Sequence, residues 1–288
     1  MKHLSLAPPS VLDYFGSLVA EDEGFALLEA AICVGHDDQP ELDAQTVLAE
    51  IDRLAGRLKG RLATDAPPLR RLQALNQYFF GELGFAGNVN NYYDRRNSYV
   101  HEVLKSRRGI PITLALLYAE LAGQLGLTAR GLSFPGHFLV KLRLPQGAVV
   151  IDPCDGRSLS RSDLDERLAP YRARLGLGGD FETPLGLFLQ AAPARDVLAR
   201  LLFNLKEIHR SAEDWPRLLA VQQRLVMLLP RAPQERRDRG LTWAELGHSA
   251  AAAEDLAAYL SERPEADDAP ALRERLAQLR GSGASGWH

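Results

Sequence analysis

The stretch "RGIPITLALLYAELAGQLGLTARGLSF", residues 108–134, contains the change of periodicity that decides the fold. Gly109 and Pro111 are residue types expected where one helix ends and the next begins at its first turn. Residues 112–125 are apolar on most of the helix circumference, which predicts a buried central helix. After Gly126 the apolar residues follow the shorter spacing of strands. The sequence therefore predicts a central helix that leads directly into a sheet.

Three short segments rich in apolar and β-branched residues come next. They are "ARGLSF", "HFLVKLRL" and "AVVIDP", separated by Pro-Gly and Pro-Gln-Gly turns, and we expect the last two to form a hairpin. Side chains alternate between the two faces of a sheet along each strand. The number of residues in the loop around Gln146 and Gly147 therefore decides whether His137 and Asp152 lie on the same face. An even loop places His137 and Asp152 on one face of the sheet, and an odd loop places them on opposite faces.

The chain before this core has a helical pattern from about residue 10 to residue 80. "TVLAEIDRLAGRLKGRL" and "LRRLQALNQYFFGELGF" are both amphipathic, and Pro67 and Pro68 separate them. A polar, turn-rich stretch follows, after which Asn97 or Ser98 is expected to cap a short helix that ends near Leu104.

The C-terminal part carries the sign of a helical repeat. Pro230 and Pro264 stand 34 residues apart (264 − 230), which is the tetratricopeptide period, and "WAELGHSAAAAEDLAAYL" has the Leu-Gly turn and small residues of that repeat. We expect two repeats and a final helix, "ALRERLAQL", although an unrelated helical bundle is the alternative. Stacked repeats leave a concave surface that usually binds a protein segment. The sequence identifies neither the binding residues within 196–280, nor the partner, nor the oligomeric state.

The composition is that of an ordinary folded protein. The chain has 288 residues, of which 46% are hydrophobic, and this length suffices for two modules of roughly 100–150 residues. The formal net charge of −3 supplies no overall field to hold nucleic acid or an anionic membrane. A local patch is the remaining route to nucleic-acid binding, through the basic residues Arg95, Arg96, Lys105, Arg107 and Arg108.

Signals for targeting and for metal binding are missing from the sequence. No apolar run has signal-peptide length or approaches the ~20 residues that cross a bilayer, so we expect a cytoplasmic protein without membrane contact. Cys33 and Cys154 are too few for a disulfide framework. No His-x-x-x-His or Cys-x-x-Cys pair occurs, so we expect neither a metal site nor a cofactor.

The order of residues around the central helix matches a site for acyl transfer. Such a site needs a nucleophile at a helix start, a histidine base and an orienting carboxylate. The segment resembles the transglutaminase-like core of the papain-type superfamily, in which a Gly-x-Cys opens the helix. Here Gly109, Ala115, the run "LGLTAR", His137 and Asp152 match that pattern, but Pro111 takes the place of the cysteine. Proline has no thiol or hydroxyl, so the covalent mechanism cannot begin at this position.

Two other residues are candidates to replace the missing nucleophile. Thr113 is two residues further along the helix, and its hydroxyl is a poor nucleophile without activation. Cys154 directly follows Asp152-Pro153 and could approach His137 across the hairpin, although it lacks a helix dipole to activate it. The alternative is a purely structural role, in which a hydrogen bond from His137 to Asp152 connects two neighbouring strands.

A longer set of motifs resembles the SirB-one-like bacterial family, which joins a transglutaminase-like core to tetratricopeptide repeats. "NSY", "RRGIPI", "PGHFLV" and "IDPCDG" occur in the family's order, and the family itself has Gly-Ile-Pro-Ile at the helix start. Cys154 departs from the family, which usually has a large apolar residue there. The resemblance implies an α+β fold with N-terminal helices, a central helix on a small antiparallel sheet, and an all-α repeat region.

Two functions follow from these observations. The first is a non-catalytic scaffold or adaptor that binds a protein partner through the repeats, and the resemblance suggests a regulatory role for it. The alternative is a cysteine- or histidine-dependent hydrolase or amide-transferring enzyme that uses His137 and Asp152. The expected domains are a transglutaminase-like domain with the N-terminal helices (1–165), a connecting region (166–195), the repeats (196–280) and a disordered tail (281–288).

Overall fold

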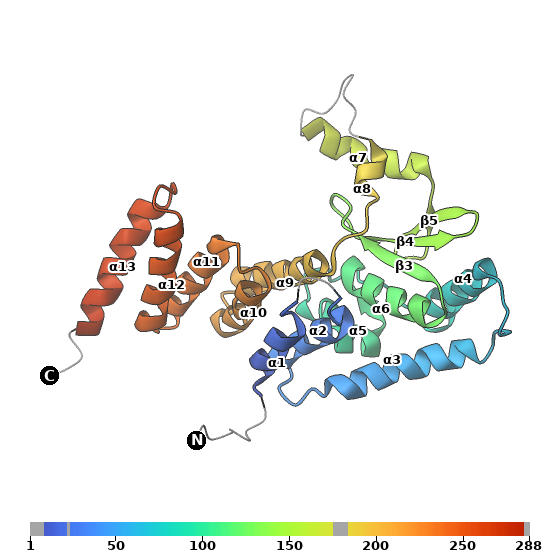
Figure 1. The fold of residues 1–288 in the computed structure, drawn as a ribbon, viewed down its shortest axis with the longest axis horizontal. Coiled ribbons are helices and arrows are strands. Elements are labelled where there is room, and N and C mark those ends of the chain that lie inside the picture. The colour runs from blue at the N-terminus through green and yellow to red at the C-terminus, as the bar shows by residue number, and fades with distance from the viewer. Residues whose placement is uncertain (1–8, 22–23, 175–183, 285–288) are drawn as a thin grey trace. The chain divides into compact units, whose positions relative to one another are not determined.

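A computed structural model describes residues 9–21, 24–174 and 184–284 of the chain. These residues form two compact units (Figure 1). The core unit consists of Leu27–Gly35 and Glu41–Val197, and the repeat unit consists of the described parts of Met1–Ala26, His36–Pro40 and Leu198–His288. None of the described helices is both long enough and apolar enough to span a bilayer.

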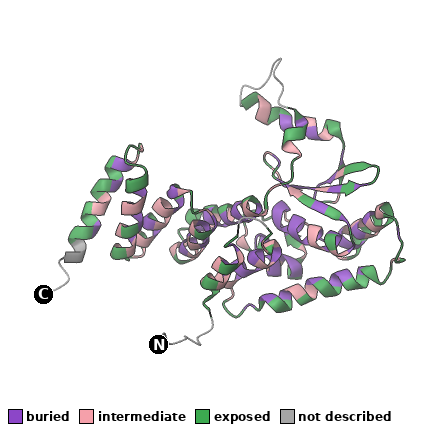
Figure 2. Ribbon diagram, in the orientation of Figure 1, coloured by how far each residue is buried: buried purple, intermediate pink, exposed green. Residues whose placement is uncertain are grey.

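One buried helix, α6 (Pro111–Gln124), organises the core unit. It lies between the sheet on one side and α3 (Ala44–Lys59) on the other (Figure 1). Ten of its 14 residues are buried, including all of Pro111–Tyr118 (Figure 2), as the apolar sequence predicts. The other helices of this unit are α2 (Leu27–Cys33), α4 (Pro68–Asn76), a π-helix (Gln77–Glu82), α5 (Val100–Ser106), α7 (Arg161–Arg174) and α8 (Leu185–Phe188).

The sheet of the core unit has four antiparallel strands in the order β3-β4-β5-β6. They are β3 (Thr128–Leu132), β4 (Leu139–Leu144), β5 (Gly147–Ile151) and the two-residue β6 (Ser158–Leu159). The predicted hairpin is confirmed, because Leu144 pairs with Gly147 and only two residues form the loop between them. Because this loop length is even, the alternation of side chains along the strands places His137 and Asp152 on one face of the sheet.

A second, very short pair of strands connects the start of α6 to the segment after β5. β1 (Ala86–Gly87) pairs in parallel with β2 (Arg108–Gly109). The N–H of Gly87 also donates to the carbonyl of Cys154 at 2.9 Å. Gly87 therefore connects two segments: it pairs with Gly109, two residues before the first residue of α6, and it hydrogen-bonds to Cys154.

The predicted cap of the short helix before α6 is wrong. α5 begins at Val100 and has Tyr99 at its N-cap, without a side-chain hydrogen bond. Asn97 is buried, and its amide donates to the carbonyls of Asn91 and Tyr92 at 2.6 and 3.2 Å. Its side chain thus closes the preceding loop and is not available to cap a helix.

The helices of the repeat unit follow the predicted 34-residue period. α10 (Trp215–Leu228) and α12 (Ser249–Glu262) begin 34 residues apart (249 − 215) and are both 14 residues long. The turns before them repeat as well, because the N–H of Asp214 donates to His209 and that of His248 to Trp243. The other members are α1 (Val11–Leu18), most of α9 (Ala194–Ser211), α11 (Pro233–Glu245) and α13 (Ala269–Ala284).

Regions expected to be irregular contain helices. α13 continues to Ala284, so residues 281–284 are helical although we expected them in a disordered tail. The connecting region 166–195 includes the second half of α7 and all of α8. Most of its segment "GLGGDFETPLG", and residues 285–288, lie outside the described residues. The α+β class, with helices, a small sheet and a helical repeat region, is confirmed.

Candidate functional site

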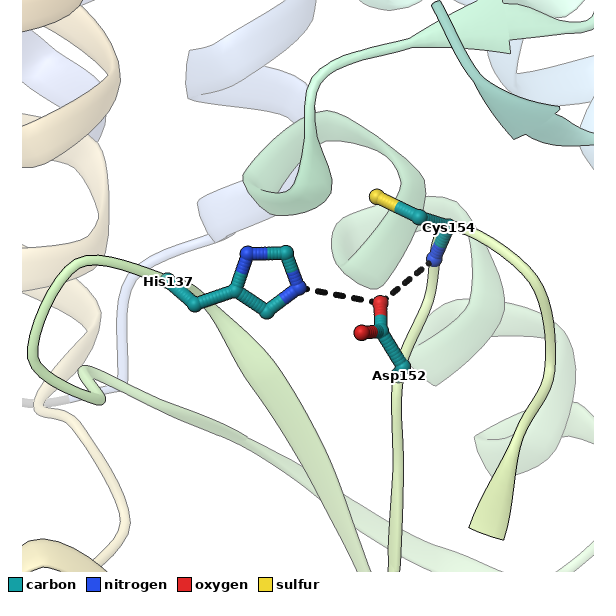
Figure 3. Close-up of side chains that lie close together, drawn as sticks. All are labelled: His137, Asp152 and Cys154. Carbon is teal, nitrogen blue, oxygen red and sulfur yellow. Dashed lines mark hydrogen bonds and ion pairs between the residues drawn. The ribbon is translucent and has the colours of Figure 1, made fainter. Parts of the chain in front are cut away.

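Three polar side chains meet where the hairpin of β4 and β5 leaves the sheet. His137 lies in the turn before β4, and Asp152 and Cys154 lie just after β5. The last pair of the hairpin ladder is Val140 and Ile151, and continuing this register places His137 opposite Cys154. Figure 3 shows the three side chains converging from these two segments.

Asp152 is the centre of the hydrogen bonds in this cluster. Its Oδ1 lies 3.0 Å from Nε2 of His137 and accepts the backbone N–H of Cys154, also at 3.0 Å. Its Oδ2 accepts from Nη1 of Arg167, on α7, at 3.0 Å. The side chain of Asp152 is 6% exposed and that of His137 is 26% exposed. The carboxylate is therefore fixed on both oxygens, whereas the imidazole is partly open to solvent.

The environment keeps Asp152 ionised. Burial raises the pKa of this carboxyl. The hydrogen bonds from His137, from the Cys154 N–H and from Arg167 outweigh this effect and lower the pKa to about 2. At neutral pH the group is a charged acceptor. The proton between Asp152 and His137 therefore belongs to Nε2, which fixes the orientation of the ring.

The surroundings of Cys154 disfavour its thiolate form, whereas those of a reactive cysteine stabilise it. Burial raises its pKa to about 12, and the negative charges of Asp152 and Asp155 contribute in the same direction. The thiol is therefore protonated at neutral pH. A reactive cysteine needs a lowered pKa, so the structure gives Cys154 no activation as a nucleophile.

The start of α6 provides no nucleophile either. Pro111 is the first residue of the helix and is buried, and Ile110 at the N-cap makes no side-chain cap. The Thr113 side chain is fully buried, and its Oγ1 donates to the carbonyl of Ser98 at 3.4 Å. The hydroxyl is thus directed into the protein and is not accessible from solvent.

At least four of the five basic residues that could form a nucleic-acid patch make contacts within the chain. Arg96 pairs with Asp94, Lys105 with Glu102, Arg108 with the carbonyl of Gly84, and Arg107 lies over the ring of Phe85. Burial also lowers the pKa of Arg107. Arg96 and Lys105 remain 63% exposed in these ion pairs.

Sequence reasoning missed two residues of the cluster. Arg167 belongs to a region expected to be a connection, and it approaches Asp152 from α7. Gly87 lies against Cys154, since a Cβ at Gly87 would come within 3.0 Å of both Cβ and Sγ of that cysteine. No local motif marks either residue, because the contacts join segments that are distant in the sequence.

Comparisons with known proteins agree with this architecture. A model of the transglutaminase-like superfamily matches residues 45–203, and a tetratricopeptide-repeat model matches residues 205–277. A UPF0162 protein of Xylella fastidiosa (strain 9a5c) is 36% identical over 262 residues, which cover 90% of this chain and 92% of the relative. One from Pseudomonas aeruginosa is 30% identical, with coverage of 88% and 91%, and one from Escherichia coli K12 is 26% identical, with coverage of 87% and 91%. No solved structure matches the chain significantly.

Proposed function

Because this chain belongs to the transglutaminase-like superfamily and to the UPF0162 family, we propose that it is a non-catalytic scaffold that binds a protein partner through its repeats. The combination of domains expected from the sequence is confirmed by the two family matches. The role itself is our inference, and it includes a cytoplasmic location.

One observation carries the proposal: Pro111 is the first residue of α6, where the superfamily pattern has its cysteine. The helix dipole that would lower the pKa of a thiol is present, but the side chain has nothing to ionise. The two substitutes are also unsuitable, because Thr113 is buried and the Cys154 thiol is protonated at neutral pH. The site thus retains the His137–Asp152 pair, but none of these candidate residues is an activated nucleophile.

The repeat unit offers a surface on two neighbouring helices. Nζ of Lys206 on α9 binds Glu235 at 2.6 Å and Asp238 at 2.7 Å, and both carboxylates belong to α11. The same two helices expose the large apolar side chains of Phe203 and Leu241, which are 38% and 37% exposed. Tetratricopeptide arrays bind their partners on an extended concave surface, and we propose that these two apolar side chains of α9 and α11 contribute contacts to the partner.

The test is a comparison of three full-length baits in a bacterium that encodes the chain. Cross-linked complexes of the wild type, of Phe203→Glu with Leu241→Glu, and of Leu69→Glu are purified and quantified by mass spectrometry. Leu69 is the matched control, because it is 47% exposed but lies on α4 in the core unit. We expect one protein to be enriched with the wild type and with Leu69→Glu, and lost with the double variant. Equal recovery with all three baits would contradict the proposal.

The retained His137–Asp152 pair, with its 3.0 Å contact to a charged carboxylate, supports one second candidate, a hydrolase or amide-transferring enzyme. A thiol-reactive probe distinguishes the two functions. We expect slow labelling of Cys154 at neutral pH, at the same rate in wild type and in His137→Ala, because its pKa is raised to about 12. Fast labelling that disappears in His137→Ala would instead support the enzyme.

A further inference from the structure

We propose that His137, Asp152 and Cys154 form a three-ligand site for Zn²⁺ or a similar borderline-soft divalent cation. A ring nitrogen, a carboxylate oxygen and a sulfur, one from each residue, all lie within 4.8 Å of one another. This site goes beyond the scaffold role, since it lies in the core unit and involves no residue of the repeats.

The donor atoms select the class of metal. Imidazole nitrogen, carboxylate oxygen and thiolate sulfur are the three kinds of protein ligand that zinc takes, whereas Mg²⁺ and Ca²⁺ take oxygen ligands. On binding, the thiol gives its proton to solvent, so Asp152 and Cys154 together bring two negative charges. These outweigh the single positive charge of Arg167, which lies beside Asp152.

The geometry requires only small adjustments. Zinc–ligand bonds of about 2.0–2.3 Å at a tetrahedral angle place the donor atoms roughly 3.3–3.6 Å apart. Nε2 of His137 and Oδ1 of Asp152 are 3.0 Å apart, close to this separation. Since no donor pair is more than 4.8 Å apart, a pair at that limit has to approach by about 1 Å. The metal would replace the proton that now joins His137 to Asp152.

The surroundings support the ligands as they do at known metal sites, where outer hydrogen bonds hold each ligand in place. Arg167 holds Oδ2 of Asp152 and leaves Oδ1 directed toward His137. Gly87 fixes the backbone of Cys154 through its N–H, and its missing Cβ leaves room for the sulfur. Since His137 and Cys154 are only partly buried, an ion can reach the site, and a fourth position stays open to water.

The experiment begins with the full-length protein, dialysed against a chelator and then titrated with Zn²⁺ in competition with a chromogenic chelator. A parallel titration with Co²⁺ follows the thiolate-to-cobalt charge-transfer band in the near ultraviolet. We expect one ion per chain and a clear band in the wild type. The band reports sulfur ligation directly, so this result does not depend on how any variant folds.

Three variants complete the test. Cys154→Ser is expected to lose the band, and both it and His137→Gln should bind Zn²⁺ at least ~10-fold more weakly. Cys33→Ala is the matched control, because Cys33 is the other cysteine and is buried in α2, and it should leave both signals unchanged. A wild-type cobalt complex without the band, or unchanged Zn²⁺ affinity in Cys154→Ser, would mean an adventitious ion only and would overturn the proposal. Neither result would affect the scaffold function, which the pull-down tests separately.

Discussion

At the scale of single residues, Asp152 connects more of the core unit than any motif indicates. Its two oxygens receive His137 from before β4, the backbone of Cys154 from after β5, and Arg167 from α7. These contacts favour the charged form and hold its pKa at about 2, below the ordinary value of 3.8. The folded state therefore binds this proton less tightly than the unfolded chain does, which couples the group to stability.

We predict that Asp152→Asn lowers the free energy of unfolding of the metal-free protein by ~2 kcal/mol at neutral pH. Because the folded-state pKa is the lower one, this stabilisation is present above about pH 4 and is lost as the pH falls toward 2. Urea unfolding at a series of pH values, with chelator present, measures the difference between wild type and variant. Asp155→Asn is the control, since Asp155 is exposed. A difference that does not shrink in acid would contradict this explanation.

The residues of the site were only partly predictable from the sequence. His137 and Asp152 fit the superfamily pattern. The alternation of side chains along the hairpin predicts that they lie on the same face of the sheet if the loop length is even. A metal site was not expected, because ligand motifs depend on close spacing within one segment. The proposed ligands are one residue before β4 and two residues after β5, and the two-residue loop brings these segments together. Arg167 comes from a helix that periodicity did not reveal.

At the scale of elements, the repeat is more regular in its backbone than in its residue types. The turn before α10 has Glu213 at a φ of 53°, and the equivalent position before α12, 34 residues later (247 − 213), has Gly247 at 78°. Both turns thus need a left-handed residue, which costs free energy for any side chain with a Cβ. Only the second repeat has the residue that adopts this conformation easily.

We predict that Glu213→Gly stabilises the repeat unit by about 0.5–1 kcal/mol, because it removes this strain at an exposed position. Gly247→Ala should destabilise it by a similar amount. A Cβ at Gly247 would meet no atom within 4 Å, so that loss would come from the backbone alone. Thermal unfolding of the two variants and the wild type measures both effects. If Glu213→Gly melts at or below the wild-type temperature, the turn is not strained.

Elements with a clear period were predictable, and the shortest ones were not. The apolar run of α6 and the strands β3, β4 and β5 are long enough to show their spacing. β1, β2 and β6 contain two residues each, so no alternation exists to detect. Their positions depend on backbone pairing between distant segments.

At the scale of the whole molecule, each of the two compact units has an apolar core of its own. In the core unit, α6 packs against the sheet and α3. The repeat unit contains buried ion pairs, of which Lys206 with Glu235 and Asp238 is the clearest. The sequence did not reveal that α1 belongs to the same unit, where it contacts α10. Its pattern is simply amphipathic, and this does not identify the surface that it covers.

We predict that Lys206→Met destabilises the repeat unit by roughly 3–5 kcal/mol, because it leaves the buried Glu235 carboxylate without its cation, whereas Asp238 keeps its ion pair with Arg237. Lys206 and Glu235 are 8% and 5% exposed, so water cannot replace the lost partner. Adding Glu235→Gln to this variant should restore part of the loss. Amide hydrogen exchange measured along the chain locates the effect, which we expect in α9 and α11, while α6 keeps its protection. Loss of protection in α6 to the same extent would show that the two units unfold as one and would contradict their separate stabilisation.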